Sequence, residues 1–309
     1  MAGLSAASAL RQAGRKVLVL DKGRGVGGRL ATRRAEGAVF DHGAQFVTAR
    51  TARWRALIDQ WSQDGVATEW CRGFSGEADG HPRWRGQPGM TAIAKALAEG
   101  LELRLQTQVT SLRRQEAVWG LATATIEQLL ARAVVLTAPV PQSLALLDSG
   151  GVTLPTVMRT RLEAITYERC LVVMATLDEP SKVPPPGGLA LTDGPIAWIG
   201  DNQQKGISVE PALTIQASAE YSLANWDRPR EETARELLTA AAPWLGGRVV
   251  QQQVHGWRYS RPQRIDDCAA LELSAQPPLI LAGDAFAGAR VEGAALSGRA
   301  AAEKLLGMD

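Results

Sequence analysis

The first twenty residues combine a helical and a strand-like hydrophobic pattern. Residues 4–13 place apolar side chains at helical spacing, and Gly14 is a typical stop signal for a helix. The run from Lys16 to Leu20 is almost continuously apolar, which is typical of a parallel strand buried on both faces. The pattern therefore predicts a helix and then a buried strand that ends at Asp21.

Residues 51–136 carry a mixed pattern of helices and strands. A helix is predicted over residues 51–63, because apolar side chains fall on one of its faces, at Trp54, Leu57, Ile58 and Trp61. The remaining stretches predict a loop-rich segment at 73–89, a helix at 90–99, the strands of a meander at 101–105, 109–113 and 117–123, and a buried strand at 133–136.

From about residue 153 the predicted strands become longer, and loops rich in proline and glycine separate them. Strands are predicted at 170–177, 196–200, 213–219 and 249–259, with one helix at 229–241. A buried strand at 279–281 and an alanine-rich helix at 293–306 then return to the first pattern. We therefore expect two interleaved domains: an α/β domain from residues 1–47, 89–149 and 271–309, and a mostly antiparallel one from residues 48–88 and 150–270.

The composition limits the class of protein. Lys and Arg number 34 against 32 Asp and Glu, which argues against a nucleic-acid binder that works through a basic surface. Three scattered cysteines and three histidines give no pattern for a metal site. No apolar run reaches the ~18 residues of a membrane span, and no signal peptide is visible, so a cytoplasmic protein is expected. The 31 glycines indicate tight turns or a backbone that closely approaches a ligand.

The first helix and strand contain half of a dinucleotide-binding unit. In a complete unit a glycine-rich turn and the following helix hold a pyrophosphate, and an acid after the next strand binds ribose hydroxyls. Here Gly3 opens the helix, and Asp21 lies close to the ~20-residue offset expected for that acid. Glycines at 25, 27 and 28 follow, with Arg29 able to pair with a phosphate. Ordinary turn chemistry and a flexible loop are the alternative interpretation.

A second candidate site lies near the C-terminus. The strand at 279–281 brings Asp284 to its carboxyl end, which is where α/β sheets bind ligands. A helix is predicted to begin at Gly293, with no side chain in front of its free N–H groups. Such a terminus stabilises an anion, and a reduced flavin is one.

Histidine and aromatic residues form a candidate substrate pocket. His255, Trp257 and Tyr259 share one face of a predicted strand, and Arg258 is predicted to be exposed on the other face. These three side chains either line a pocket, which we favour, or fill the core of the second domain. His42 is either a proton shuttle or flavin neighbour, or a structural histidine.

Five segments carry motifs at wide intervals: KGRGVGGRLATRR (22–34), DHGAQF (41–46), PGMTAIAKALA (88–98), WRYSRP (257–262) and residues 283–298. Together they resemble the renalase-like branch of the FAD-dependent amine oxidase superfamily. The first and last motifs are specific to FAD binding in that fold. The resemblance implies an α/β plus α+β protein, in which a Rossmann-like FAD-binding domain is interleaved with a mostly antiparallel substrate domain.

The resemblance also implies roles around FAD. Asp21 would hold the adenosine ribose, Gly28 and Arg29 would flank the pyrophosphate, and Val109 would contact the adenine. Gly3 matches the third glycine of the family's first turn, and Lys22 counts among the cofactor-binding residues. The remaining implied contacts are His42, Gly43, Ala44 and Gln45 at the isoalloxazine, Gly283 and Asp284 at the ribityl or pyrophosphate region, and Glu292, Gly293 and Ala294 at the pyrimidine edge.

The function implied by this resemblance is hydride transfer from a small molecule to FAD, with molecular oxygen as the final acceptor. The implied substrate is an isomeric dihydronicotinamide dinucleotide, such as a 2- or 6-dihydro form. An amine or porphyrinogen-type oxidase on the same scaffold is the rival interpretation. The family also opens with a strand and two glycines that have no match here, so we expect these to be encoded just upstream. The alternative is a non-catalytic remnant that no longer binds FAD.

Overall fold

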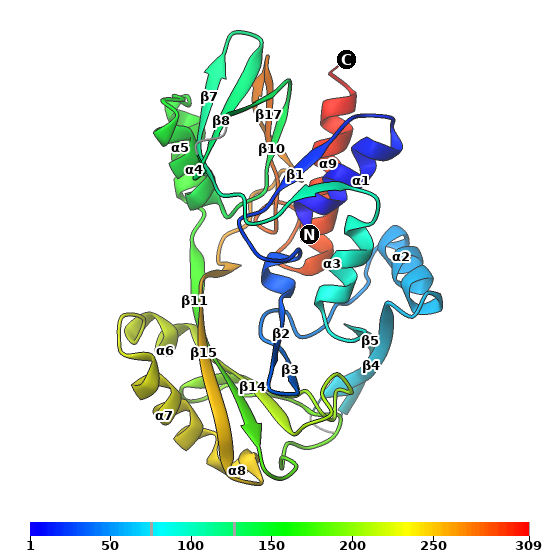
Figure 1. Ribbon diagram of the computed structural model, residues 1–309, viewed down its shortest axis with the longest axis vertical. Helices are drawn as coiled ribbons and strands as arrows, with labels where there is room; N and C mark the ends of the chain where they lie inside the picture. The colour runs from blue at the N-terminus through cyan, green and yellow to red at the C-terminus, as the bar shows by residue number, and fades with distance from the viewer. Residues whose placement is uncertain (75–76, 126–127, 309) are drawn as a thin grey trace. The chain divides into compact units, whose positions relative to one another are not determined.

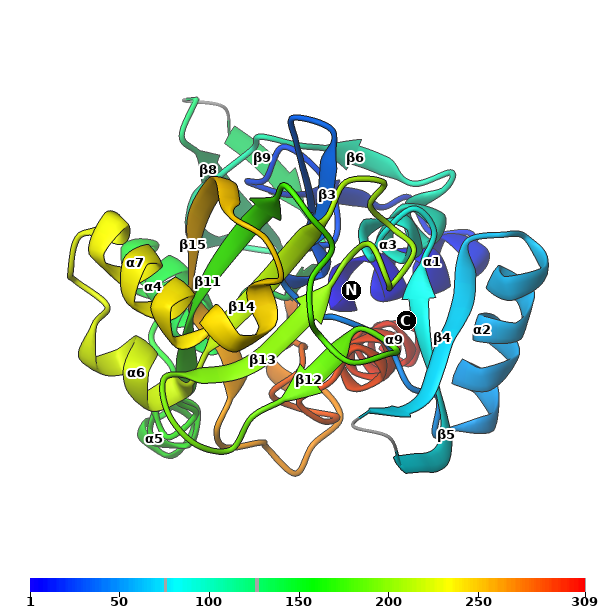
Figure 2. The ribbon, with the colours of Figure 1, turned by 90° about the horizontal axis from the view of Figure 1, so that it is seen from below.

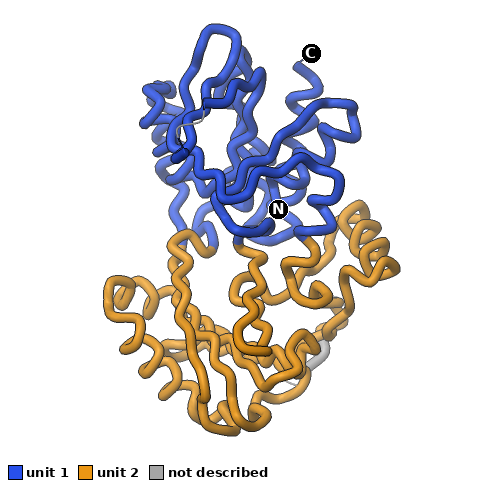
Figure 3. The backbone as a smooth tube through the Cα atoms, in the orientation of Figure 1, with its two compact units in different colours: residues 1–28, 94–167, 261–309 blue, residues 29–93, 168–260 orange. Residues whose placement is uncertain are grey.

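The computed structural model describes residues 1–74, 77–125 and 128–308. The chain forms two compact units, each built from segments that are distant in the sequence (Figure 3). Unit 1 comprises residues 1–28, 94–167 and 261–309, and unit 2 comprises residues 29–93 and 168–260. Unlike the predicted bounds, residues 29–47 and 89–93 lie in unit 2, and residues 150–167 and 261–270 lie in unit 1.

Unit 1 is an α/β unit with a separate meander (Figure 1). Its helices are α1 (Ala2–Gln12), α4 (Val140–Ser149), α5 (Thr156–Glu163) and α9 (Val291–Leu306). Its strands are β1 (Leu18–Leu20), β6 (Glu102–Arg104), β7 (Val109–Gln115), β8 (Val118–Thr123), β9 (Gln128–Ala131), β10 (Val134–Leu136), β16 (Leu271–Ala275) and β17 (Pro278–Leu281). β1 pairs in parallel with β6, β10 pairs in parallel with β17, and β16 adds to β17 antiparallel.

Two strand predictions for unit 1 were wrong in part. The predicted meander begins at β7 and continues through β8 and β9, whereas the first strand predicted for it, β6, pairs with β1 instead. β1 is half-buried rather than buried on both faces. The reason is that, among the described residues, no strand pairs with its other edge.

Helices α1 and α9 pack closely because small residues face each other. A Cβ at Gly298 would lie 2.0 Å from the carbonyl oxygen of Ala2, so only glycine permits this approach. Ala9 and Ala302 are buried in the same contact. Figure 1 shows the two helices side by side, with the N-terminal residue of α1, Ala2, against Gly298 in the middle of α9.

Unit 2 is mostly antiparallel. Its helices are α2 (Ala52–Gln63), α6 (Ala219–Ala224), α7 (Arg230–Ala240) and α8 (Ala242–Leu245). Its strands are β2 (Thr32–Ala35), β3 (Ala38–Asp41), β4 (Ala67–Phe74), β5 (Glu77–Gly86), β12 (Gly188–Ala190), β13 (Ile196–Asp201) and β14 (Ala212–Ala217). A unit boundary falls within η1 (Gly28–Leu30), α3 (Thr91–Ala98), β11 (Tyr167–Leu177) and β15 (Val249–Pro262).

The central sheet of unit 2 has the order β12-β13-β14-β11-β15 (Figure 2). Leu171, Val173 and Leu213 from its strands pack with Leu237 of α7 in one hydrophobic core. The helices therefore cover one face of the sheet. The other face packs Met174 of β11 against Phe40 of β3.

The prediction of a loop-rich segment at residues 73–89 was largely wrong. β4 and β5 form an antiparallel hairpin there, although residues 75–76 lie outside the described part of the chain. Gly73, Gly80 and Pro82 masked the strand pattern. A two-stranded ribbon tolerates these residues because it has open edges and register irregularities.

Candidate flavin and substrate site

The turn after β1 is held by hydrogen bonds on both sides of Asp21. Its Oδ1 accepts a 2.7 Å bond from the backbone N–H of Gly23. Its carbonyl oxygen accepts a 2.9 Å bond from the N–H of Thr107, two residues before Val109. The structure thus brings the predicted ribose residue close to the chain segment of the predicted adenine contact.

Four glycines, in the turn after β1 and in the loop after β17, leave space where a side chain would be. A Cβ added to Gly25, Gly28, Gly283 or Gly288 would meet no heavy atom within 4 Å. A backbone with open space in front of it is suited to close approach by a phosphate. Lys22 is exposed beside this turn.

Gly3 has a different role, because it is the second residue of α1 and is close-packed. A Cβ there would lie 3.0 Å from Oγ1 of Thr137, immediately after β10. This is the close helix–strand packing that the third glycine of a dinucleotide-binding turn provides.

The loop from β17 to α9 is also fixed in place. The N–H of Gly283 donates a 2.9 Å hydrogen bond to Oγ of Ser297, which ties the end of β17 to α9. α9 begins at Val291, two residues before the predicted start. Gly293 therefore lies within the first turn, where a Cβ would be 2.1 Å from the carbonyl oxygen of Gly288. Its lack of a side chain lets the 287–288 backbone pack against the helix.

In unit 2 the structure brings together three of the predicted pocket residues. The rings of His42 and Trp257 are stacked, with centroids 5.3 Å apart and an interplanar angle of 23°. His255 meets both rings edge-on, at 5.0 Å from His42 and 4.3 Å from Trp257. The indole Nε1 of Trp257 donates a 2.8 Å hydrogen bond to the carbonyl oxygen of His42. Tyr259 lies two residues further along β15 and is half-buried, and Arg258 is exposed as predicted.

Both imidazoles of this group are electrically neutral at neutral pH. Burial, together with the nearby His255 and Arg33, lowers the pKa of His42 to about 4. Burial also lowers the pKa of His255, with Arg33 and Arg230 acting in the same direction. Nδ1 of His42 and Nε2 of His255 are buried and have no hydrogen-bond partner among the described residues. They are therefore available to a bound molecule.

A buried ion pair supports this group, and no local pattern in the sequence indicates it. Nζ of Lys205 lies 2.6 Å from Oδ2 of Asp41, and both side chains are fully buried. Oδ1 of Asp41 accepts hydrogen bonds from Oγ1 of Thr32 and from the N–H of Met90. Burial lowers the pKa of Lys205, whereas Asp41 opposes that change. The pair fixes the backbone directly before His42.

The segment from Gly43 to Gln45 is close-packed. A Cβ at Gly43 would lie 2.0 Å from the carbonyl oxygen of Arg29. Nε2 of Gln45 donates to the carbonyl oxygens of Asp41 and Gly43, at 2.6 and 3.1 Å. Oε1 of Gln45 is buried without a partner among the described residues. An aromatic cluster that sequence reasoning missed lies beside it, formed by Phe46, Trp70, Phe74 and Trp198.

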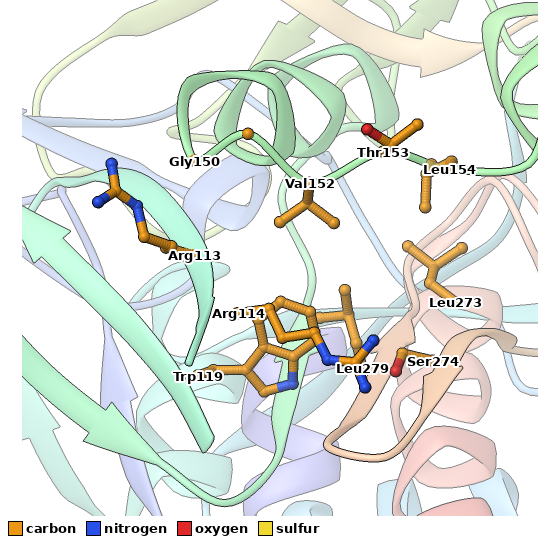
Figure 4. Close-up of a pocket in the computed structure, with 11 residues that line it drawn as sticks. Arg113, Arg114, Trp119, Gly150, Val152, Thr153, Leu154, Leu273, Ser274 and Leu279 are labelled. Atoms are coloured by element: carbon orange, nitrogen blue, oxygen red, sulfur yellow. The ribbon is translucent and has the colours of Figure 1, made fainter. Parts of the chain in front are cut away.

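A separate cavity of about 290 Å³ lies in unit 1, between β7, the loop after α4 and β16 (Figure 4). Its lining includes Arg113, Trp119 and Leu273, and Trp119 lies at its base. None of the predicted cofactor or pocket residues lines this cavity.

The predicted site residues divide between the two units. The part in unit 1 fits a flavin dinucleotide, because an acid after β1 and open glycine turns are present. The part in unit 2 offers buried polar atoms, Nδ1 of His42 and Nε2 of His255, that have no hydrogen-bond partner in the described part of the chain. Unit 1 holds Gly3, Asp21, Lys22, Gly28, Val109, Gly283, Asp284, Glu292, Gly293 and Ala294, and unit 2 holds Arg29, His42, Gly43, Ala44, Gln45, His255, Trp257 and Tyr259.

Comparison with known families assigns the class of protein. Residues 70–306 match the flavin containing amine oxidoreductase family, and residues 1–61 match an NAD(P)-binding Rossmann-like domain. The first match covers more than half of the chain, so the protein belongs to the flavin containing amine oxidoreductases.

Solved structures of similar fold include two oxidases and an isomerase. A triple mutant of putrescine oxidase is 16% identical, with a TM-score of 0.75 over 100% of this chain and 97% of that one. A protein described as a protoporphyrinogen oxidase from Exiguobacterium sp. 255-15 is 16% identical, with a TM-score of 0.73 over 98% and 96%. A fatty acid isomerase from P. acnes is 12% identical, with a TM-score of 0.70 over 98% and 96%. At these identities the similarity shows the fold alone. In the parts of the chain that the structure describes, no helix combines the length and apolarity needed to cross a bilayer.

Proposed function

We propose that the protein is an FAD-dependent oxidase of the renalase-like type, which takes a hydride from an anionic small molecule. The proposed substrate is an isomeric dihydronicotinamide dinucleotide. Bound FAD would supply the chemistry of accepting a hydride and passing two electrons to oxygen, which yields hydrogen peroxide.

The residues of the chain would bind and orient both molecules. Asp21 would accept hydrogen bonds from the adenosine ribose, and the glycine turns around Gly28 and Gly283 would admit the phosphates. His42 and His255, both neutral, would offer their unpartnered nitrogens to the polar edge of the substrate. The Trp257 indole, fixed by the carbonyl oxygen of His42, would hold those rings in place.

The observation that carries this proposal is the charge around the histidine pair. The imidazoles are neutral, and Arg33 and Arg230 supply positive charge to them. A protonated amine would be repelled there, whereas the phosphates of a dinucleotide would be attracted. The electrostatics therefore favour the dinucleotide over an amine as substrate.

The test is to add each substrate to the FAD-loaded protein without oxygen. Reduction of the flavin is measured as the loss of its absorption. We expect bleaching by 2- or 6-dihydronicotinamide dinucleotide and none by putrescine. We also expect Arg33→Gln to raise KM for the dinucleotide about tenfold, and the matched control Arg34→Gln, an exposed neighbour, to change it less than twofold.

Bleaching by putrescine and not by the dinucleotide would replace this proposal with an amine oxidase. A colourless protein that cannot be reconstituted with FAD would overturn every flavoenzyme interpretation.

A further inference from the structure

Three arginines surround one tryptophan on the helix-covered side of the sheet in unit 2. The guanidinium carbons of Arg169, Arg230 and Arg258 lie 5.1, 5.2 and 5.6 Å from the ring centroid of Trp226. Arg169 comes from β11, Arg258 from β15, and Arg230 is the first residue of α7. Trp226 is 7% exposed and belongs to the core, so the rings and chains around it are fixed.

Gly256 makes this arrangement possible. A Cβ there would lie 2.9 Å from the Cη2 atom of Trp226 and 3.4 Å from Nη2 of Arg230. Because this position lacks a side chain, Arg230 and Trp226 reach the edge strand β15.

None of the three guanidinium groups is paired with a carboxylate in the described part of the chain. Nη1 of Arg230 is buried and has no partner there. Arg228 shows the contrast, since it pairs with both Glu232 and Glu236 at 3.0 and 2.8 Å. Stacking on an indole stabilises each arginine but does not neutralise its charge. Three like charges around one ring therefore leave an uncompensated positive region.

The N-terminus of α7 adds to this positive region. Its N-cap is Pro229, and no side chain caps the first turn. Two acids lie in that turn, but Glu232 is bound to Arg228 and Glu231 is exposed. Asp227 is also exposed.

We infer that Arg169, Arg230 and Arg258 form a binding site for a phosphate-bearing ligand, with Trp226 as its base. Guanidinium groups match phosphate oxygens in geometry and charge better than any other side chain. The phosphate belongs either to the substrate or to a separate ligand. The substrate is a candidate because the positive charge of Arg230 also influences His255 of the proposed substrate pocket. The site does not depend on the proposed oxidase activity.

The experiment is calorimetric titration of the FAD-loaded protein with inorganic pyrophosphate at constant ionic strength. We expect saturable binding that Arg169→Gln and Arg258→Gln each weaken about tenfold. Arg235→Gln removes the same charge from an exposed position of α7 and should change the affinity less than twofold. This comparison distinguishes binding at the three arginines from binding elsewhere on the protein. Binding elsewhere includes binding at the FAD site of any molecules that have lost FAD.

A second titration, in the presence of the dihydronicotinamide dinucleotide, identifies the source of the phosphate. Competition would assign the arginines to the substrate's own phosphates, and independent binding would assign them to a separate ligand. Equal affinity in the parent and both arginine variants, or no binding at all, would overturn the site. Circular dichroism of each variant shows whether the fold has been kept.

Discussion

Glycines in the turns of unit 1 differ from two glycines of unit 2, although Gly3 and Gly293 of unit 1 are close-packed as well. In unit 1, Gly25, Gly28, Gly283 and Gly288 face open space. In unit 2, Gly43 and Gly256 each approach a neighbour so closely that a Cβ would collide with it. Unit 1 therefore presents an accessible backbone, whereas unit 2 presents packed side chains and a buried ion pair. The first arrangement suits binding of a common cofactor, and the second suits recognition of a particular substrate.

The largest effect should come from the buried pair in unit 2. Lys205→Met removes the positive partner of Asp41 and leaves a buried carboxylate, which should cost about 3–5 kcal/mol of the free energy of unfolding. Lys182→Met makes the same chemical change at an exposed position of the same unit, and we expect about 0.5 kcal/mol or less. Urea denaturation of both variants beside the parent gives the two values. Similar small losses would mean that unit 2 is not held by this pair.

The next effect is a loss of stability in acid. The pKa of His42 is about 4 in the folded protein against 6.5 for a free histidine, so the unfolded chain binds more protons between these values. Stability is therefore fully present above pH 6.5 and falls as the pH drops towards 4, by up to about 3 kcal/mol. His42→Phe should remove that part of the pH dependence. His81→Phe, at an exposed histidine of the same unit, should keep it. Identical slopes in all three proteins would contradict a buried neutral His42.

A pair of glycine substitutions tests the contrast itself. Gly43→Ala places a Cβ against the backbone of residue 29 and should lower the free energy of unfolding by about 1–3 kcal/mol. Gly25→Ala should leave the stability of the FAD-free protein unchanged, because its Cβ meets nothing, but should weaken FAD binding if the turn holds a phosphate. Thermal unfolding and flavin retention after dialysis measure the two effects. If the Gly43→Ala variant were as stable as the parent, or the Gly25→Ala variant retained all of its flavin, the contrast between packed and open glycines would not hold.

Local patterns predicted most of the elements, and long-range contacts explain what was missed. The apolar run before Asp21 predicted β1, and the position of Trp257 on a strand face predicted a cluster with His255. The pairing of Asp41 with Lys205 joins residues 164 apart, and nothing in the local sequence distinguishes Lys205 from a surface lysine. The strands around Pro82 were missed because proline and glycine are poor strand formers in general but are tolerated in a ribbon.

The most specific effect concerns the acid after β1. If Asp21 binds the adenosine ribose, Asp21→Ala should weaken FAD binding by about 1–3 kcal/mol, because one or two hydrogen bonds are left unmade. Asp21→Asn keeps an oxygen for the N–H of Gly23, so it should preserve the turn and lose a smaller part of that affinity. Asp267→Ala, at an exposed acid of unit 1, controls for the change in net charge and should bind FAD like the parent. Flavin retention and fluorescence titration with FAD measure all four proteins. Under the alternative interpretation, in which Asp21 only closes the turn, the alanine variant would lose stability while its affinity for FAD stayed equal to that of the asparagine variant. That outcome would leave the open glycines of unit 1 as the remaining support for a dinucleotide site in that unit.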